Sequence, residues 1–210
     1  MSPARKKLAS PATLKKKAST PTKKAPVKPA ARKAPPQTAP YSEGKWAEAF
    51  TPRAPGERRY WLVKSEPEAF SFEDLLAAPK QTTCWDGVRN FAARNFLRDA
   101  MKRGDGVFFY HSSANPQVIV GICEVVREGY PDHTALDAKH PHFDAESDAN
   151  APTWFQVDVR AVEKFARPVT LAAIKLRPEL ANMAVLRIGR LSVTPVRRAE
   201  WDTIVGMSRG

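Results

Sequence analysis

The first forty residues of the chain contain eleven Lys and Arg residues and no Asp or Glu, mixed with Ala, Pro, Ser and Thr. Apolar side chains are too sparse in this segment to form a core, and prolines interrupt every potential helix. Of the 34 basic residues in the whole chain, 23 therefore belong to the remaining 170 residues, where 22 acidic residues nearly balance them. We predict one folded domain in this second part, preceded by a disordered basic tail over residues 1–45.

A tail of this composition neutralises phosphate groups without reading base sequence, and its affinity falls steeply as the salt concentration rises. The Lys15, Lys16 and Lys17 cluster is its densest group of candidate phosphate contacts. Two alternatives are an extension that only keeps the protein soluble and a start site that is partly wrong.

Several classes of protein do not fit the sequence. No apolar run approaches the roughly 18 residues that a bilayer-spanning helix needs, and the N-terminus has no apolar secretory segment. Two cysteines, Cys84 and Cys123, are too few for a disulfide framework. We therefore expect a cytoplasmic protein, nucleoid-associated if it is bacterial, with no membrane partner; the oligomeric state is left open.

Residues 46–58 are interpreted as a linker before a domain that spans residues 59–206. Trp46 and Phe50 lie four residues apart, so one short amphipathic turn would place both rings against the domain surface.

The domain has a mixed pattern of short elements. Ser71 is a predicted helix N-cap with Asp74 at the third helical position, and Gly121 inside an apolar run indicates a bulge or a close backbone approach. Five or so strands with short peripheral helices indicate the α+β class, with a small curled sheet or barrel. The predicted strands are 60–64, 106–111, 118–127, 153–165 and 191–193, and the predicted helices are 71–78, 90–101, 170–175, 178–186 and 198–205.

Two motifs carry the functional prediction. An apolar strand at 60–63 continues directly into Lys64, Ser65, Glu66 and Pro67, and about twenty residues later Trp85 begins the segment WDGVRN. A nucleobase that leaves its stack needs an aromatic platform, hydrogen-bonding groups for its edge and cations for the flanking phosphates. The two motifs together provide these groups, so they predict a pocket for a flat, hydrogen-bonding ligand.

Each candidate residue also has a structural alternative. Trp85 is the predicted platform, with Trp61 or Trp154 as a second wall, but core packing is the alternative for every Trp. Asp86 and Asn90 can read a base edge, although they can equally serve the turn around Gly87.

The other candidates lie at predicted strand ends and in the loops beside them. Ser65 is a predicted donor to a base carbonyl, whereas Glu66 can equally form a structural ion pair, and the arginines can form surface ion pairs. The candidate pocket residues are Lys64, Ser65, Glu66, Trp85, Asp86, Val88, Asn90, His111, Ser112, Trp154 and Ser192, and the candidate phosphate contacts in the domain are Arg89, Arg94 and Arg190.

Several segments carry a family resemblance in a consistent order. They are YWLVKSEP (60–67), FSFEDL (70–75), WDGVRN with the helix after it (85–105), FFYHS (108–112), IVGICEVV (119–126), PDHTA (131–135), WFQVDV (154–159) and RLSVTPVRRAEW (190–201). Together they resemble an EVE domain, and they are similar to its bacterial members.

The resemblance implies a PUA-like fold of five to six strands, related to the YTH and ASCH domains. It also implies a pocket for a modified base, with a 5-modified cytosine in DNA as the expected class. After His111 and Ser112 the chain departs from the common family pattern, so the modification itself is left open.

Two alternatives remain beside a DNA reader. The YTH and PUA relatives suggest an RNA reader, and Asp86, Asn90 and His111 could transfer protons in an enzyme. The chain contains neither a Gly-rich phosphate loop nor a G-x-S-x-G elbow. Its histidines and cysteines lack a C-x-x-C spacing. We therefore expect no catalysis, no metal and no cofactor.

Overall fold

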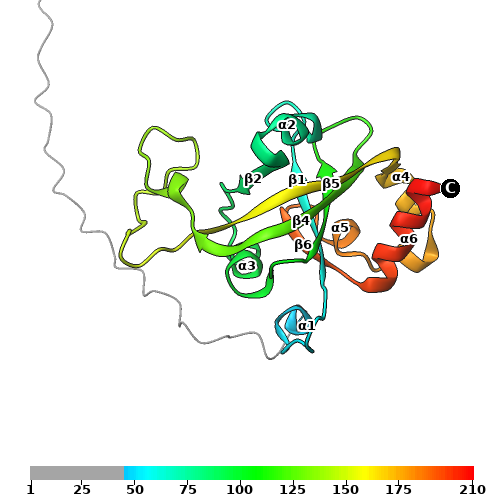
Figure 1. Cartoon of the computed structure of the whole chain (residues 1–210), viewed down its shortest axis with the longest axis horizontal. Coiled ribbons are helices and arrows are strands. Elements are labelled where there is room, and N and C mark those ends of the chain that lie inside the picture. Colours follow the sequence, from blue (N-terminus) through cyan, green and yellow to red (C-terminus); the bar gives the residue numbers. More distant parts are fainter. Residues whose placement is uncertain (1–44) are drawn as a thin grey trace, which may run out of the picture. The chain divides into compact units, whose positions relative to one another are not determined.

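The structure is a computed structural model that describes residues 45–210 (Figure 1). The predicted basic tail, except Lys45, lies outside the described residues, and so do the candidate phosphate contacts Lys15, Lys16 and Lys17.

The described residues form a six-stranded mixed sheet in the order β2-β5-β4-β3-β1-β6. Strands β1 and β3 run parallel to each other, and the other neighbouring pairs are antiparallel. The sheet is curled and does not close into a barrel, which confirms the predicted α+β, PUA-like class. The strands are β1 (Tyr60–Ser65), β2 (Thr82–Trp85), β3 (Gly106–His111), β4 (Val118–Pro131), β5 (Phe155–Thr170) and β6 (Val193–Val196).

The helices are short and peripheral. Ser71 and Asp74 form the capping box of α2, and the Thr170 hydroxyl caps α4, as predicted. The prediction of one helix over 178–186 is wrong, because a 3₁₀ turn at Pro178–Leu180 and α5 replace it. The helices are α1 (Ala47–Phe50), α2 (Phe72–Ala77), α3 (Phe91–Asn95, continued by a π-helical turn at Phe96–Ala100), α4 (Leu171–Lys175), α5 (Ala184–Arg187) and α6 (Arg198–Arg209). None of the helices within residues 45–210 has the length and apolar character needed to cross a membrane.

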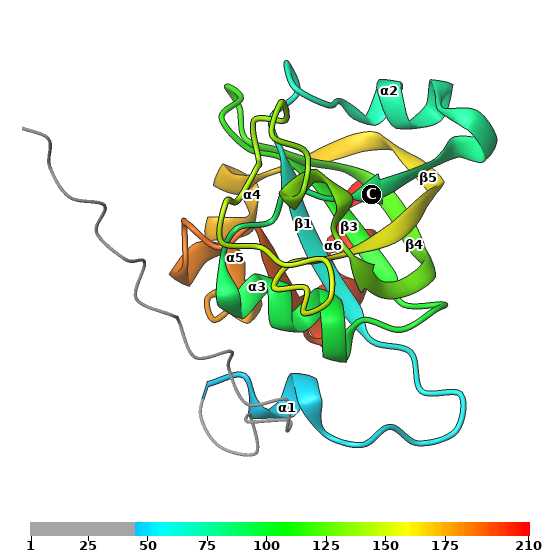
Figure 2. The same cartoon turned by 90° about the vertical axis from the view of Figure 1, so that its left-hand side faces the viewer.

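Strand β1 is buried on both faces and separates two hydrophobic clusters. Trp61 and Val63 belong to the cluster that contains residues of α2 and α3, whereas Tyr60 and Leu62 belong to the cluster that contains residues of α4 and α6. Figure 1 shows α4, α5 and α6 gathered on one side of the sheet, and Figure 2 shows β1 running through the middle of the domain. A strand with two buried faces reads as a continuous apolar run, which is why β1 was predictable.

Gly121 lies where β4 approaches its neighbours closely. A Cβ atom at this position would lie 2.6 Å from the Glu163 carbonyl oxygen and 2.6 Å from the Phe72 ring. The register between β4 and β5 also shifts between Ile119 and Gly121. Both observations confirm the predicted irregularity at this glycine.

Residues 45–58, called here the N-terminal strap, are fastened to the domain. The rings of Trp46 and Phe50 each lie 5.5 Å from the ring of Phe96 between centroids. Arg53 donates two hydrogen bonds of 2.6 and 2.7 Å to the carboxylate of Asp105. The strap therefore packs on the domain surface at the predicted turn.

Asp105 connects the strap to the sheet. Its carboxylate is 1% exposed and also accepts hydrogen bonds from the Arg59 amide (3.1 Å), the Trp61 indole (2.8 Å) and the Lys102 amide (3.0 Å). A buried carboxylate is stable only when such donors replace its water. This residue therefore holds the strap, the start of β1 and the turn before β3 in one arrangement.

We predict that Asp105→Ala lowers the free energy of unfolding by about 3–5 kcal/mol, because the buried indole and the Arg53 charge lose their acceptor. Urea denaturation measures this change. Glu128→Gln is the control, since Glu128 and Lys102 form an exposed pair at 3.0 Å and its loss should cost about 0.5 kcal/mol or less. Equal effects of the two substitutions would contradict the role of Asp105.

Candidate base-binding site

Three strand ends meet at one end of the sheet. In the parallel β1–β3 pair, Ser65 lies opposite His111, and the Ser112 amide donates to the Ser65 carbonyl at 2.8 Å. On the other side of β1, the Lys64 amide donates to the Ser192 carbonyl at 2.9 Å. The structure therefore brings Lys64, Ser65, His111, Ser112 and Ser192 together in one place, called here the strand-exit site.

Polar side chains at the strand-exit site already have protein partners. The Ser65 hydroxyl donates to the Phe70 carbonyl at 2.6 Å, and the Glu66 carboxylate accepts from the Ser113 hydroxyl at 3.0 Å. The Lys64 ammonium donates to the Gly189 carbonyl at 2.8 Å, and burial lowers the pKa of Lys64. The ammonium also donates to the Ile188 carbonyl at 3.5 Å, and since an ammonium has three donors, Lys64 keeps one donor for a ligand.

Trp85 lies at the end of β2 and packs into the core. Its side chain is 8% exposed, and its ring meets that of Phe109 edge to face at 5.3 Å. Val88 and Leu191 belong to the same buried cluster. A base can stack on Trp85 only after neighbouring side chains move. In this conformation Trp85 is therefore a core residue, which is the structural alternative to its predicted role as a platform. Trp61 is 1% exposed and cannot form a second wall here.

The polar residues after Trp85 serve the local backbone. The Asn90 amide oxygen accepts from the Ala92 and Ala93 amides at 2.9 and 3.2 Å and caps α3. Asp86 accepts from the Cys84 thiol at 3.2 Å. Burial and this carboxylate raise the pKa of Cys84 to about 12, so the thiol is not an activated nucleophile.

Arg89, a predicted phosphate contact, forms an internal ion pair with Asp132. Its guanidinium donates to Asp132 at 2.7 Å, to the Thr134 hydroxyl at 2.9 Å and to the His142 carbonyl at 2.8 Å. Asp132 also accepts from the Gly87 amide at 2.9 Å. Burial opposes the charge of Asp132, but these hydrogen bonds still hold its pKa below the usual value. Together they fix the Trp85–Asn90 loop against residues 132–142.

Arg94 and Trp154 also have structural partners. Arg94, also a predicted phosphate contact, is 3% exposed and donates to the Thr153 carbonyl at 2.7 Å. The Trp154 indole donates to Asp144 at 2.6 Å, and the ring is 6% exposed. Of the predicted phosphate contacts in the domain, Arg190 is exposed.

Phe91 is a candidate that the sequence did not indicate. Its ring is 42% exposed and stacks on Trp154 at 5.0 Å between centroids. The predicted helix placed Phe91 beside polar Asn95 and Arg98, so no local pattern distinguished it. The ring follows the Trp85–Asn90 loop directly, and the Arg94 guanidinium lies 5.1 Å from its centroid, so it is an aromatic surface that is more exposed than Trp85 but already has partners.

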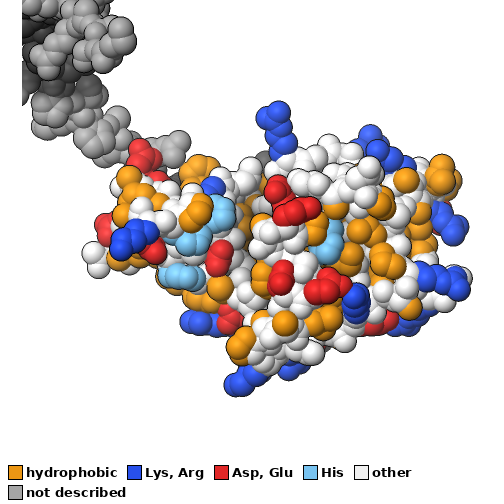
Figure 3. Space-filling view, turned by 90° about the horizontal axis from the view of Figure 1, so that it is seen from above, with side chains coloured by type: hydrophobic (Ala, Val, Ile, Leu, Met, Phe, Trp, Pro, Cys, Tyr) orange, Lys and Arg blue, Asp and Glu red, His pale blue; other side chains and the backbone are white. Residues whose placement is uncertain are grey.

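The face of the molecule that carries α2 is not uniformly basic. Figure 3 shows acidic, histidine and hydrophobic side chains near its middle, with Lys and Arg mostly at its edge. Recognition on such a face depends on short-range contacts more than on a long-range field.

The fold and this site define a PUA-like domain, and comparison with known proteins gives its family. The EVE domain model matches residues 59–207, so the chain belongs to the EVE domain family. Thymocyte nuclear protein 1 from Homo sapiens is 44% identical over 165 residues, which covers 70% of this chain and 73% of the human protein.

Two solved structures extend the comparison. A hypothetical protein from Leishmania major is 44% identical with a TM-score of 0.70, covering 73% of this chain and 96% of that one. The human THYN1 protein, in complex with DNA that contains 5-methylcytosine, is 43% identical with a TM-score of 0.70, covering 72% of this chain and 98% of that one.

Substitution of Gly87 tests whether the Trp85–Asn90 loop is held in place by residues 132–142. This glycine has a φ of +71°, and an added Cβ would lie 2.4 Å from Nδ1 of His142, whereas Gly56 has a φ of +76° and nothing within 4 Å. We predict that Gly56→Ala costs about 1–2 kcal/mol from backbone strain alone. Gly87→Ala should cost at least about 1 kcal/mol more, because the His142 ring must also move.

Urea denaturation of both variants measures the difference in unfolding free energy. Adding His142→Ala to Gly87→Ala should restore part of the extra stability that Gly87→Ala loses. Equal costs for the two glycines would show that His142 does not hold the loop.

His111 should make the stability of the domain depend on pH. Its Nε2 accepts from the Phe72 amide at 3.2 Å, and burial lowers its pKa below 6.5, although Glu73 and Glu68 oppose the shift. The unfolded chain then binds a proton more readily than the native one. We predict that this part of the stability is present above about pH 6.5 and is lost as the pH falls toward the native pKa.

Urea denaturation at about pH 7.5 and about pH 5.5 measures this loss. In His111→Gln the amide oxygen accepts without titrating, so the variant should lose less stability on acidification. The same loss in both proteins would exclude His111 as the cause.

Proposed function

We propose that this chain binds DNA and recognises a 5-methylated cytosine at the strand-exit site. The observation that carries the proposal is the human relative of the same fold, 43% identical, in complex with DNA that contains 5-methylcytosine. The proposal is for a binding module and assigns no catalytic residue.

The chemistry of the strand-exit site supports this proposal. Ser65, Lys64 and the exposed backbone groups beside them can hydrogen-bond a base edge. The apolar side chains of Val88 and Leu191 lie in the same cluster as Trp85 and can contact a methyl group. One methyl group in an apolar pocket contributes about 1–3 kcal/mol, so selectivity of about 10- to 200-fold is expected.

Affinity and selectivity have different sources in the proposal. The eleven cations of residues 1–40 add affinity for any phosphate backbone, and this part weakens with salt. The nearly neutral domain adds selectivity through contacts with the base. Stacking contributes about 1–3 kcal/mol per base, with Trp85 or the exposed Phe91 as the platform.

The test compares duplexes that differ at one cytosine. Fluorescence anisotropy with the full chain and with residues 45–210 should give tighter binding to the 5-methylcytosine duplex, with the same ratio for both proteins. Deleting residues 1–44 should weaken both affinities and reduce the dependence on salt. Equal affinity for both duplexes would sink the proposal, and tighter binding of single-stranded RNA of the same sequence would favour an RNA reader instead.

Trp85 and Trp201 form a matched pair for mutagenesis, because each is 8% exposed in its own core cluster. We predict that Trp85→Phe lowers the preference for 5-methylcytosine by about tenfold, since part of the stacking surface is lost. Trp201→Phe should leave the preference unchanged while costing similar stability. A preserved preference in Trp85→Phe would exclude Trp85 as the platform and leave Phe91 to be tested.

A further inference from the structure

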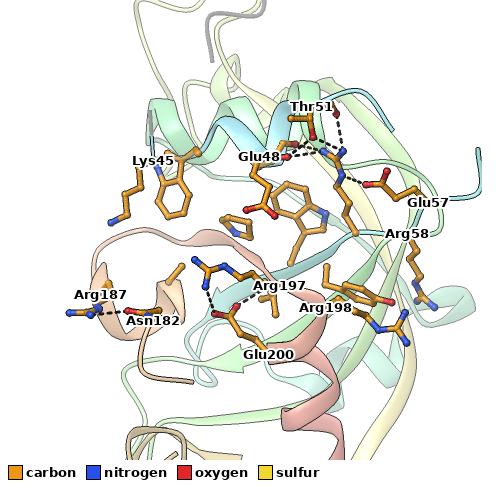
Figure 4. A pocket seen from close by; sticks show the side chains of 18 residues that line it. Lys45, Glu48, Thr51, Glu57, Arg58, Asn182, Arg187, Arg197, Arg198 and Glu200 are labelled. Atoms are coloured by element: carbon orange, nitrogen blue, oxygen red, sulfur yellow. Dashed lines mark hydrogen bonds and ion pairs between the residues drawn. The ribbon is translucent and has the colours of Figure 1, made fainter. Parts of the chain in front are cut away.

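A cavity of about 500 Å³ opens at the start of β1, away from the strand-exit site (Figure 4). One wall is the N-terminal strap with Lys45, Trp46 and Glu48, and the opposite wall comes from α5, β6 and the first residues of α6. Tyr60 and Trp61, the first residues of β1, form its floor. The family match begins at residue 59, so the strap wall comes from outside the matched region.

Positive charge dominates the lining of this cavity. Six basic and three acidic side chains line it, which leaves an excess of three positive charges. The basic residues are Lys45, Arg58, Arg59, Arg187, Arg197 and Arg198, and the acidic residues are Glu48, Glu57 and Glu200.

Two of the arginines are committed to other partners. Arg59 donates to Glu57 at 2.8 Å and to the Ala49 and Thr51 carbonyls of the strap, each at 2.8 Å. Arg198 donates to both carboxylate oxygens of Asp202 at 2.9 and 2.8 Å. These two side chains build the walls, and their charges are largely neutralised.

Three other cations keep their charge available. Among residues 45–210, Lys45, Arg58 and Arg187 form no ion pair with a carboxylate. Arg187 donates to the neutral amide of Asn182 at 3.0 Å. Arg197 is 62% exposed and lies 3.9 Å from Glu200, at the limit of an ion pair.

Aromatic rings position two of these cations. The Arg58 guanidinium lies 5.9 Å from the centroid of the Tyr60 ring, and the Lys45 ammonium lies 5.2 Å from that of Trp46. A cation over an aromatic face loses part of its freedom without losing its hydrogen-bond donors. In Figure 4 Lys45 and Arg58 lie at opposite ends of the cavity, so each keeps donors for an anion at its own end.

We propose that this cavity is a phosphate-binding site. Guanidinium groups bind phosphate oxygens through paired hydrogen bonds, and the cavity volume lies within the range of about 300–1,000 Å³ that is usual for small-molecule sites in general. Residues 1–40 are excluded as the occupant, since all their charged side chains are basic and the net positive charge of the cavity would repel them. The phosphate belongs either to a nucleic-acid backbone or to a free nucleotide.

This site is independent of the proposed reading of 5-methylcytosine. The base contacts belong to the exit of β1, and the phosphate contacts belong to its start. Loss of the phosphate site should therefore weaken binding of methylated and unmodified duplexes by the same factor.

Proton–nitrogen NMR of the full chain tests the proposal. Sodium phosphate, cytidine monophosphate and an unmodified duplex are titrated separately, each against sodium chloride of the same ionic strength. We expect saturable shifts of the Trp46 indole and Arg58 guanidinium signals with the phosphate compounds and not with chloride. Saturation by the duplex at lower concentration than the nucleotide would assign the nucleic-acid backbone, and the reverse order would assign the free nucleotide.

Matched variants identify the residues responsible. The double variant Arg58→Gln with Arg187→Gln should weaken phosphate binding at least about tenfold. The slope of log K against log salt concentration for duplex binding should fall by the equivalent of about one to two phosphate contacts. Arg167→Gln with Lys175→Gln removes two exposed cations elsewhere and should leave the Trp46 shift intact. The absence of a saturable shift, an equal shift with chloride, or full binding by the Arg58 and Arg187 variant would overturn the proposal. Trp85→Phe should leave the Trp46 shift unchanged. A failure of the base-reading proposal can therefore be distinguished from a failure of the phosphate-site proposal.

Discussion

The carboxylate of Asp105 joins three parts of the chain that are distant in sequence: the N-terminal strap, the start of β1 and the turn before β3. It accepts five hydrogen bonds while it is 1% exposed. The donors include the Trp61 indole, whose ring lies in the core. Because β1 pairs with both β3 and β6, fixing its start also fixes where its other end meets the neighbouring strands.

The two ends of β1 therefore provide two different environments on one rigid element. At its start, the docked strap builds a cavity that is rich in arginine. At its exit, half-buried polar groups of β1, β3 and the segment before β6 come together with little net charge. A strand that is buried on both faces gives both sites one rigid support, and such support keeps a binding site precise.

The strands with continuous apolar runs and the helices with capping signals were predictable from sequence, because both signals are local. Strands β1 and β3 have such apolar runs, and the Ser71–Asp74 capping box marks the start of α2. Strand β2 was not predictable, since three of its four residues are half-buried and its pairing with β5 is a tertiary contact. The partners of Arg89 and Arg94 were not predictable for a related reason: Asp132 and Thr153 lie 43 and 59 residues further along the chain.

The burial of Trp85 links affinity to selectivity in the proposed complex. If the open conformation that exposes this ring is about 1% populated, the apparent affinity falls by about a hundredfold, or about 2.7 kcal/mol. Cations that bind backbone phosphate can offset this loss, and they do so equally for methylated and unmodified DNA. They therefore raise affinity without changing the ratio between the two ligands, which depends on the difference in binding free energy. A nearly neutral reading site is thus compatible with tight binding, provided that the positive charge lies elsewhere on the chain.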